Sequence, residues 1–149
     1  MAVNPIPEGY HTVTPYLIVE GAAGLLDFAK SAFGAEERFR MDAPDGSIGH
    51  AEVMIGDSIV MLADAGEEWP AMPALIYLYG EDCDAMYERA LAAGATSVRE
   101  PADQFYGDRN ATVRDSVGNT WGIATHIEDV TPEEVAKRIE EGAAAPQAG

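Results

Sequence analysis

The chain has 149 residues, of which 26 are Asp or Glu and 9 are Lys or Arg, so its formal net charge is −17. This charge argues against nucleic acid and anionic membranes as partners, because both would repel the chain at long range. With 47% hydrophobic and 23% charged residues, the composition is too apolar for a disordered chain and is sufficient for a folded core.

The first half of the chain contains a strand, a helix and a tight hairpin. Residues 16–19 form a short apolar strand candidate, and residues 21–34 carry apolar side chains at the spacing of three and four that is typical of a helix. The helix is expected to end at Gly34, because glycine readily adopts the left-handed conformation of a helix C-cap. Residues 55–58 read Ile-Gly-Asp-Ser between apolar runs and predict a hairpin turn.

The second half repeats this order about 60 residues later. A strand is predicted at residues 76–79 and a helix at residues 82–94, with Asp82 or Asp84 as its N-cap. The glycine turn recurs at residues 117–120. Each half therefore reads strand, helix, strand, strand, strand, so the predicted fold class is α+β with two βαβββ modules, at about residues 10–66 and 72–130.

A short helix is expected to follow the second module. Thr131, Pro132 and Glu134 combine an N-cap, a proline at the first helical position and a glutamate three residues after the cap. Residues 131–149 are thus predicted to form a C-terminal helix and, from residue 143 onward, a frayed tail.

Strand alternation selects the side chains that can meet a ligand. Over residues 48–55, it puts Gly49, Ala51, Val53 and Ile55 under the helix and leaves Ile48, His50, Glu52 and Met54 on the open face. In the second module it likewise puts His126 and Glu128 together on an open face. The two His-x-Glu pairs have three interpretations: metal ligands, general acid–base groups, or histidines that only hydrogen-bond a neighbouring carboxylate or are merely exposed.

Further polar candidates lie in the second module. Asn110 falls on the open face of its strand, and Tyr106 and Arg109 belong to a polar, aromatic loop at residues 104–109 that can border a pocket. Asp108 and Arg109 can equally be a structural ion pair. Trp121 falls on the helix side and is expected in the core. The sequence has no nucleophile elbow, phosphate loop or dinucleotide fingerprint.

Cys83 is the only cysteine, which excludes an intramolecular disulfide and a cysteine-based zinc site. The N-terminus has no basic region followed by an apolar run, and no apolar stretch reaches the length of a membrane helix. A cytoplasmic location is therefore expected.

Four segments resemble a known family. They are Thr-Pro-Tyr-Leu-Ile-Val at residues 14–19, Gly-His-Ala-Glu at 49–52, Phe-Tyr-Gly-Asp-Arg at 105–109 and Trp-Gly-Ile-Ala-Thr-His at 121–126. Together with the doubled module they resemble the vicinal oxygen chelate superfamily of glyoxalases, bleomycin-resistance proteins and extradiol dioxygenases, and its PhnB-like branch. The resemblance covers about residues 10–134. It implies one domain in which both modules form a curled mixed sheet around a cavity, and a homodimer.

The resemblance also bears on metal binding. The positions of the superfamily's metal ligands carry over to Thr14, Leu75, Val60 or Met61, and Gly122, none of which is a good metal ligand. The usual metal centre is therefore expected to be absent and no cofactor is predicted, with a divalent metal at the His-x-Glu pairs as the less favoured alternative.

Two classes of function remain, beside a third and least favoured one, a structural or interaction module whose cavity is vestigial. The favoured one is a protein that binds or sequesters a small organic ligand, for which the acidic composition is compatible with a cation. The alternative is a lyase, isomerase or other glyoxalase-type enzyme that uses His50, Glu52 or His126 as acid–base groups or atypical metal ligands. The predicted ligand-binding residues are Tyr16, His50, Glu52, Met54, Tyr77, Tyr106, Arg109, Asn110 and His126.

Overall fold

The computed structural model describes residues 2–142 and contains two compact units. The first runs to Ala74 and includes Ser116–Gly118; the second comprises Leu75–Asp115 and the chain from Asn119 onward. We call them module 1 and module 2.

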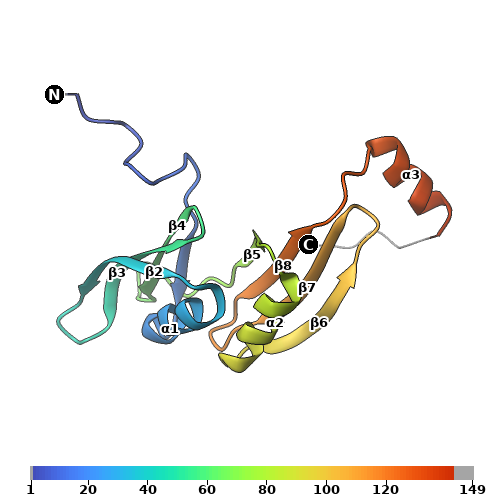
Figure 1. Ribbon diagram of the computed structural model, residues 1–149. Coiled ribbons are helices and arrows are strands. Elements are labelled where there is room, and N and C mark those ends of the chain that lie inside the picture. Colours follow the sequence, from blue (N-terminus) through green and yellow to red (C-terminus); the bar gives the residue numbers. More distant parts are fainter. Residues whose placement is uncertain (1, 143–149) are drawn as a thin grey trace. The chain divides into compact units, whose positions relative to one another are not determined.

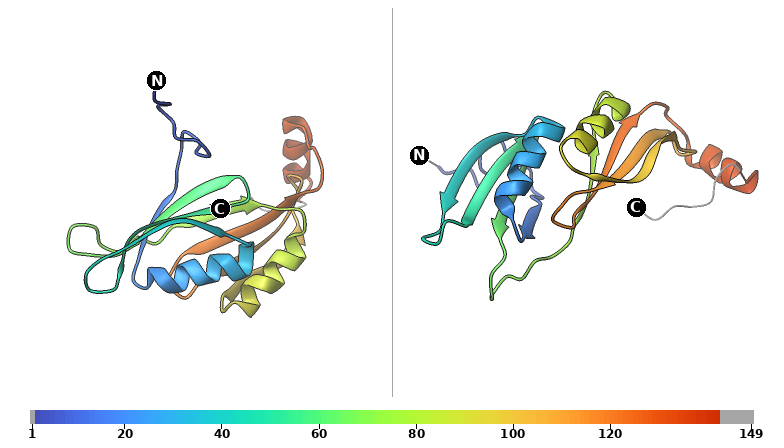
Figure 2. Two further views of the ribbon diagram at one scale, coloured as in Figure 1. Left: turned by 60° about the vertical axis from the view of Figure 1, so that its left-hand side comes forward. Right: turned by 90° about the horizontal axis from the view of Figure 1, so that it is seen from below.

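Module 1 is one four-stranded mixed sheet with a helix on one face. Its elements are β1 (Tyr16–Val19), α1 (Ala22–Phe33), β2 (Glu36–Asp42), β3 (Ile48–Ile55) and β4 (Ser58–Asp64). The strand order is β1-β4-β3-β2, with β1 parallel to β4 and the other neighbours antiparallel. Figures 1 and 2 show α1 lying along one face of this sheet. The opposite face is therefore free of helix within the module.

The core of module 1 lies between α1 and the sheet. Leu25 and Leu26 of α1 are buried, as are Ala51 and Val53 of β3 on the face that the alternation puts under the helix. The alternation fails at the start of β3, where Ile48 is only 1% exposed and Gly49 is exposed. The pairing register shifts by one residue there, and such a bulge turns the strand so that alternate positions exchange faces.

Module 2 repeats the architecture. Its elements are β5 (Leu75–Tyr79), α2 (Cys83–Ala92), β6 (Thr96–Asp103), β7 (Asp108–Arg114) and β8 (Thr120–His126), in the sheet order β5-β8-β7-β6. β5 is parallel to β8, as β1 is to β4. The predicted α+β class with two βαβββ modules is confirmed. Trp121 lies in the core, 1% exposed, and its indole N–H donates to Asp115 at 2.8 Å.

The helix caps follow the local sequence signals. The Asp82 carboxylate caps α2 by accepting the Ala85 N–H at 3.1 Å, and Gly34 closes α1 with φ +66°. Thr131 caps the C-terminal helix α3 (Pro132–Glu140) by accepting the Glu134 N–H at 3.1 Å. The tail expected from residue 143 onward lies outside the described residues. Within residues 2–142, no helix is long and apolar enough to cross a membrane.

Candidate functional site

Three side chains from β1 and β3 form a hydrogen-bonded chain on the open face of module 1. In the sheet register Met61 of β4 pairs with both Tyr16 and Glu52, so these two residues lie in one row across the sheet. The Tyr16 hydroxyl lies 2.8 Å from His50 Nδ1, and His50 Nε2 lies 2.8 Å from Glu52 Oε2. The first His-x-Glu pair is therefore in direct contact, with Tyr16 on its other side.

Glu52 also has a second donor from outside the sheet. The Tyr10 hydroxyl, in the segment before β1, donates to Glu52 Oε1. This bond, followed by the bond from His50, lowers the pKa of the Glu52 carboxyl. Burial and the bond to Glu52 in turn raise the pKa of Tyr10 to about 12. The sequence did not predict Tyr10 as a site residue, because it precedes the first strand and no local pattern connects it to Glu52.

The protonation of Glu52 fixes the roles of the His50 ring atoms. An ionised carboxylate only accepts hydrogen bonds, so Nε2 of His50 must carry a hydrogen. In the neutral imidazole, Nδ1 then has a free lone pair and accepts the phenolic hydrogen of Tyr16. Glu52 thus orients His50 with its basic nitrogen toward Tyr16.

A pocket of about 420 Å³ lies against Tyr16. It is lined by Tyr16 and Ile18 of β1 and by Trp69 and Met72 of the irregular segment that follows β4. Met72 is held beside β1 by its N–H, which donates to the Ile18 carbonyl at 3.0 Å. Trp69 is 62% exposed although it is large and apolar. The sequence did not predict Trp69 and Met72 as site residues, because their only signal was an aromatic and a thioether side chain in a proline-containing loop.

In module 2, the buried carboxylate of Asp108 accepts hydrogen bonds from three side chains. Asp108, at the start of β7, is 4% exposed and accepts hydrogen bonds from Tyr77 (2.8 Å), Tyr79 (2.9 Å) and His126 Nδ1 (3.0 Å). Burial alone would raise the pKa of the Asp108 carboxyl, but the bonds from His126, Tyr77 and Tyr79 together hold it below its usual range. Burial and its own bond to Asp108 also raise the pKa of Tyr79.

His126 does not pair with Glu128, contrary to the sequence expectation. β8 ends at His126, and the Glu128 carboxylate, beyond the strand, pairs with Arg138 of α3 at 3.0 Å. The second ring nitrogen of His126 instead lies 2.8 Å from Asp129. Since both nitrogens face carboxylates, the bonds to Asp129 and then Asp108 raise the pKa of His126 and favour the imidazolium.

Asn110 extends the network around Asp108. Its amide Nδ2 donates to the hydroxyls of Tyr77 (3.0 Å) and Tyr106 (2.8 Å), and its Oδ1 accepts from Gln104 at 3.1 Å. The structure thus brings together Tyr77, Tyr106, Asn110 and His126 in module 2. Met54, by contrast, lies on β3 of module 1, where its methyl group is 3.8 Å from the Cβ position of Gly9.

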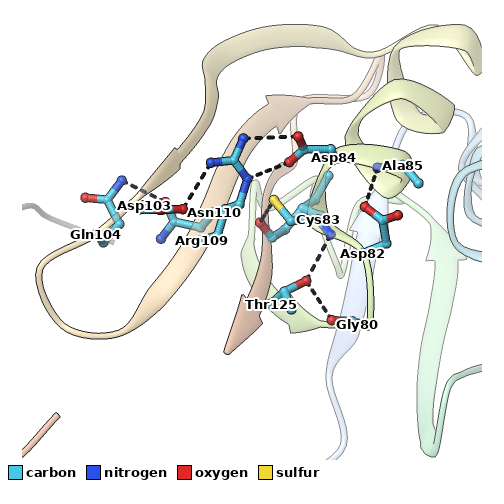
Figure 3. A network of polar contacts seen from close by, with 11 residues as sticks. Gly80, Asp82, Cys83, Asp84, Ala85, Asp103, Gln104, Arg109, Asn110 and Thr125 are labelled. Carbon is cyan, nitrogen blue, oxygen red and sulfur yellow. Dashed lines mark hydrogen bonds and ion pairs between the residues drawn. The ribbon is translucent and has the colours of Figure 1, made fainter. Parts of the chain in front are cut away.

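Arg109 of β7 connects its strand to α2 and β6 through ion pairs (Figure 3). Its guanidinium contacts both carboxylate oxygens of Asp84, at 2.8 and 3.0 Å, and Asp103 at 3.0 Å. These hydrogen bonds raise the pKa of Arg109. The alternative ion pair of Asp108 with Arg109 does not form, because Asp108 is buried among Tyr77, Tyr79 and His126.

Figure 3 also shows how the start of α2 is attached to β8. The Cys83 N–H donates to Thr125 Oγ1 at 2.9 Å, and the Thr125 hydroxyl donates to the Gly80 carbonyl at 2.8 Å. The Cys83 thiol is buried and donates to the Ile123 carbonyl at 3.3 Å. Burial raises the pKa of this thiol, which is therefore a structural group.

The residues at the superfamily's metal positions do not fit a metal ion. Thr14, Leu75 and Met61 offer no strong ligand, and Val60 is buried and apolar. At Gly122, even a Cβ atom would lie 2.6 Å from Cδ2 of Tyr77, so the tyrosine ring occupies the space of a ligand side chain. Within the described part of the chain, no three His, Cys, Asp or Glu side chains form a group that can hold a metal.

Comparison with known proteins shows the superfamily to which this chain belongs. Residues 10–123 match the sequence model of the Glyoxalase/Bleomycin resistance protein/Dioxygenase superfamily, and the chain belongs to that superfamily. An uncharacterized protein of Mycobacterium bovis is 36% identical, over 91% of this chain and 93% of its own length. An uncharacterized protein of Mycobacterium tuberculosis is also 36% identical, over 91% of this chain and 84% of its own.

Solved structures share the fold. TioX from Micromonospora sp. ML1 has a TM-score of 0.66 and 27% identity, over 78% of this chain and 99% of its own. A glyoxalase/bleomycin resistance protein/dioxygenase from Nocardioides has a TM-score of 0.61 and 20% identity, over 89% of this chain and 90% of its own. At that identity the second likeness concerns the fold alone.

Proposed function

We propose that this protein binds a small, flat organic molecule in the pocket of module 1 and does so without a bound metal. The observation that carries the proposal is the pocket itself, in which Tyr16 and Trp69 present aromatic rings beside the Met72 thioether. Ligand sites are concave and mainly apolar, with few polar groups to orient the ligand. An exposed tryptophan at such a hollow is typical of a recognition surface.

The charge of the surroundings favours a cation. Glu52 is held in its ionised form two residues from His50, and only β4 separates its strand from that of Tyr16. The faces of Trp and Tyr rings attract cations by about 0.5–2 kcal/mol each. The net charge of −17 adds a long-range attraction for the same class of ligand.

The test is a binding titration with two flat aromatic probes of opposite charge, the cation proflavine and the anion 2-naphthalenesulfonate. Proflavine is expected to raise the melting temperature and the sulfonate is not. Trp69→Ala should weaken proflavine binding at least about fivefold, because it removes one wall and one cation–π partner. Ile127→Ala, which trims another exposed apolar residue, in module 2, is the control.

Three results would contradict the proposal. The first is the failure of proflavine to bind. The second is proflavine binding that Trp69→Ala leaves unchanged, which would locate the ligand elsewhere. The third is one tightly held transition-metal ion per chain of the purified protein, measured by plasma mass spectrometry.

A second candidate function, acid–base catalysis by a lyase or isomerase, is favoured by one observation. His50 lies between a carboxylate and a phenol, at 2.8 Å from each, which is the arrangement of an oriented general base. His126 fits that role less well, because its two carboxylate partners favour the charged form.

We further infer that the protein forms a homodimer. A homodimer is supported by the edge strands β2 and β6, of which nearly every residue is exposed, including the apolar Phe39, Met41 and Val98. Light scattering coupled to size exclusion tests it. The PhnB-like affiliation and the cytoplasmic location stay predictions from the sequence.

A further inference from the structure

We propose that Tyr16, His50 and Glu52 form a proton relay, in which Tyr16 takes a proton from a flat, weakly acidic organic molecule seated in the pocket of module 1. The inference rests on the proposed binding function, because it places the substrate in the same pocket. It adds a reaction class, proton abstraction from carbon or oxygen, and assigns each residue its part.

The geometry gives the relay a direction. Of its three residues, Tyr16 is the one that lines the pocket. Its hydroxyl lies 2.8 Å from His50 Nδ1, and His50 Nε2 lies 2.8 Å from Glu52. As Tyr16 accepts a proton from the substrate, its own proton moves to Nδ1, and Glu52 stabilises the imidazolium that results. Tyr16 is the catalytic residue, whereas His50 and Glu52 act through it.

The residues around His50 allow its ring to hold the transferred proton. The titratable groups that contact the His50–Glu52 pair are Tyr16 from β1 and Tyr10 from the preceding segment. The residues that pair with His50 and Glu52 on the adjacent strands are uncharged: Met41 and Phe39 of β2, and Met61 of β4. The charged Arg40, between Phe39 and Met41, pairs instead with Ala51, and its guanidinium donates to Asp42 at 2.9 Å. No cation among these neighbours opposes formation of the imidazolium.

His126 provides the internal contrast. Both of its ring nitrogens face carboxylates, which favours a protonated ring with no lone pair to accept a proton. His50 faces one carboxylate and one phenol, so its neutral form keeps a lone pair. The two histidines therefore differ in chemistry although both stand in a His-x-Glu sequence.

The test uses 5-nitrobenzisoxazole, a flat aromatic carbon acid that opens after the loss of one proton. Its C–H bond breaks as the proton passes to Tyr16 oxygen, the C–H electron pair forms the nitrile, and the N–O bond breaks to give a coloured phenolate. The full chain is expected to accelerate this ring opening, and Tyr16→Phe and His50→Gln should each lower kcat about 100-fold. His11→Gln, which changes an exposed histidine bonded to the Asp57 carbonyl, is the control.

Further readouts separate a relay from a structural effect. Glu52→Gln should lower kcat and leave the affinity for the probe unchanged, because the carboxylate no longer stabilises the imidazolium that forms during the reaction. Glu52→Asp should restore part of the rate. Imidazole in solution should rescue His50→Ala.

Binding of the probe is measured separately, by quenching of Trp69 fluorescence with Trp69→Phe as the blank. Probe that binds and turns over at the wild-type rate in Tyr16→Phe overturns the relay, as does probe that binds without turnover; both leave the proposed binding function standing. Probe that does not quench Trp69 overturns the substrate class and the relay, whereas the failure of proflavine to bind would overturn the binding function itself.

Discussion

The ring of Tyr77 covers Gly122, the residue with which it pairs on the neighbouring strand of module 2. A Cβ atom at Gly122 would lie 2.6 Å from Cδ2 of Tyr77. The absence of a side chain at Gly122 therefore lets Tyr77 reach Asp108, to which its hydroxyl donates at 2.8 Å. A position where the superfamily carries a metal ligand is here part of a hydrogen-bond network built on a buried carboxylate.

Gly122→Ala should destabilise the protein by about 1–3 kcal/mol, because an overpacked methyl group forces the Tyr77 ring away from Asp108. Urea denaturation followed by circular dichroism measures the change. Gly24→Ala is the matched control: Gly24 lies in α1, and nothing approaches its Cβ position within 4 Å. The control should gain about 0.5–1 kcal/mol from helix propensity. Equal effects at the two sites would contradict the packing argument.

The His126 contacts predict a pH-dependent contribution to stability. The pKa of His126 is raised in the folded protein by Asp129 and Asp108, so the contribution is fully present below the unfolded value of about 6.5 and is lost as the pH rises through the higher folded value. The free energy of unfolding, measured by urea titration from pH 5 to 9, should fall over that window. His126→Gln should abolish this component; an unchanged pH profile in the variant would assign it to other groups.

Tyr10→Phe should raise the pKa of Glu52, because the bond from Tyr10 is the largest cause of its lowering. The stability that Glu52 contributes is present above the unfolded glutamate value of about 4.3 and is lost as the pH falls through the lower folded value. Carbon-13 NMR of the Glu52 carboxyl follows the titration. Tyr87→Phe, which alters a phenol bonded to Ser97 in module 2, should leave the Glu52 midpoint where it is.

Asp82→Ala should destabilise the protein by about 0.5–2 kcal/mol through loss of the α2 N-cap. Asp82→Asn keeps a side-chain oxygen at the cap and should cost much less, which separates capping from charge. Thermal denaturation of both variants decides the point. A loss of equal size in both would mean that the charge of Asp82, rather than its hydrogen bond to Ala85, stabilises the helix.

Part of the fold could be predicted because it depends on neighbours in the sequence. The caps at Asp82 and Thr131 are bonds between residues three apart, and the hairpin at Gly56, with φ +59°, joins adjacent strands as expected. The second turn differs: the chain between β7 and β8 has five residues, closed by Asp115, which accepts the Asn119 N–H at 2.9 Å. This closure is also a local contact, between residues four apart, but the glycine pattern did not predict a turn of this length.

Some contacts of the candidate site could be predicted from the sequence, whereas others depend on the fold. The contact between His50 and Glu52 follows from alternation along one strand, so the sequence indicated it. Residues Tyr10 and Trp69 lie in irregular segments, and only the folded chain brings Tyr10 to Glu52 and Trp69 to Tyr16. Their positions follow from tertiary contacts that leave no period in the sequence.

By itself, the sequence determined the two modules, their helices and the His50–Glu52 pair, because periodicity, caps and alternation act over a few residues. Only the tertiary structure decided that Ile48 is buried, that Glu128 pairs with Arg138 and that His126 pairs with Asp108 and Asp129. A bulge reverses the alternation at Ile48, and β8 ends before Glu128, so strand alternation does not apply to that residue. Both effects depend on strand pairing, in which each residue's partner is distant in the chain.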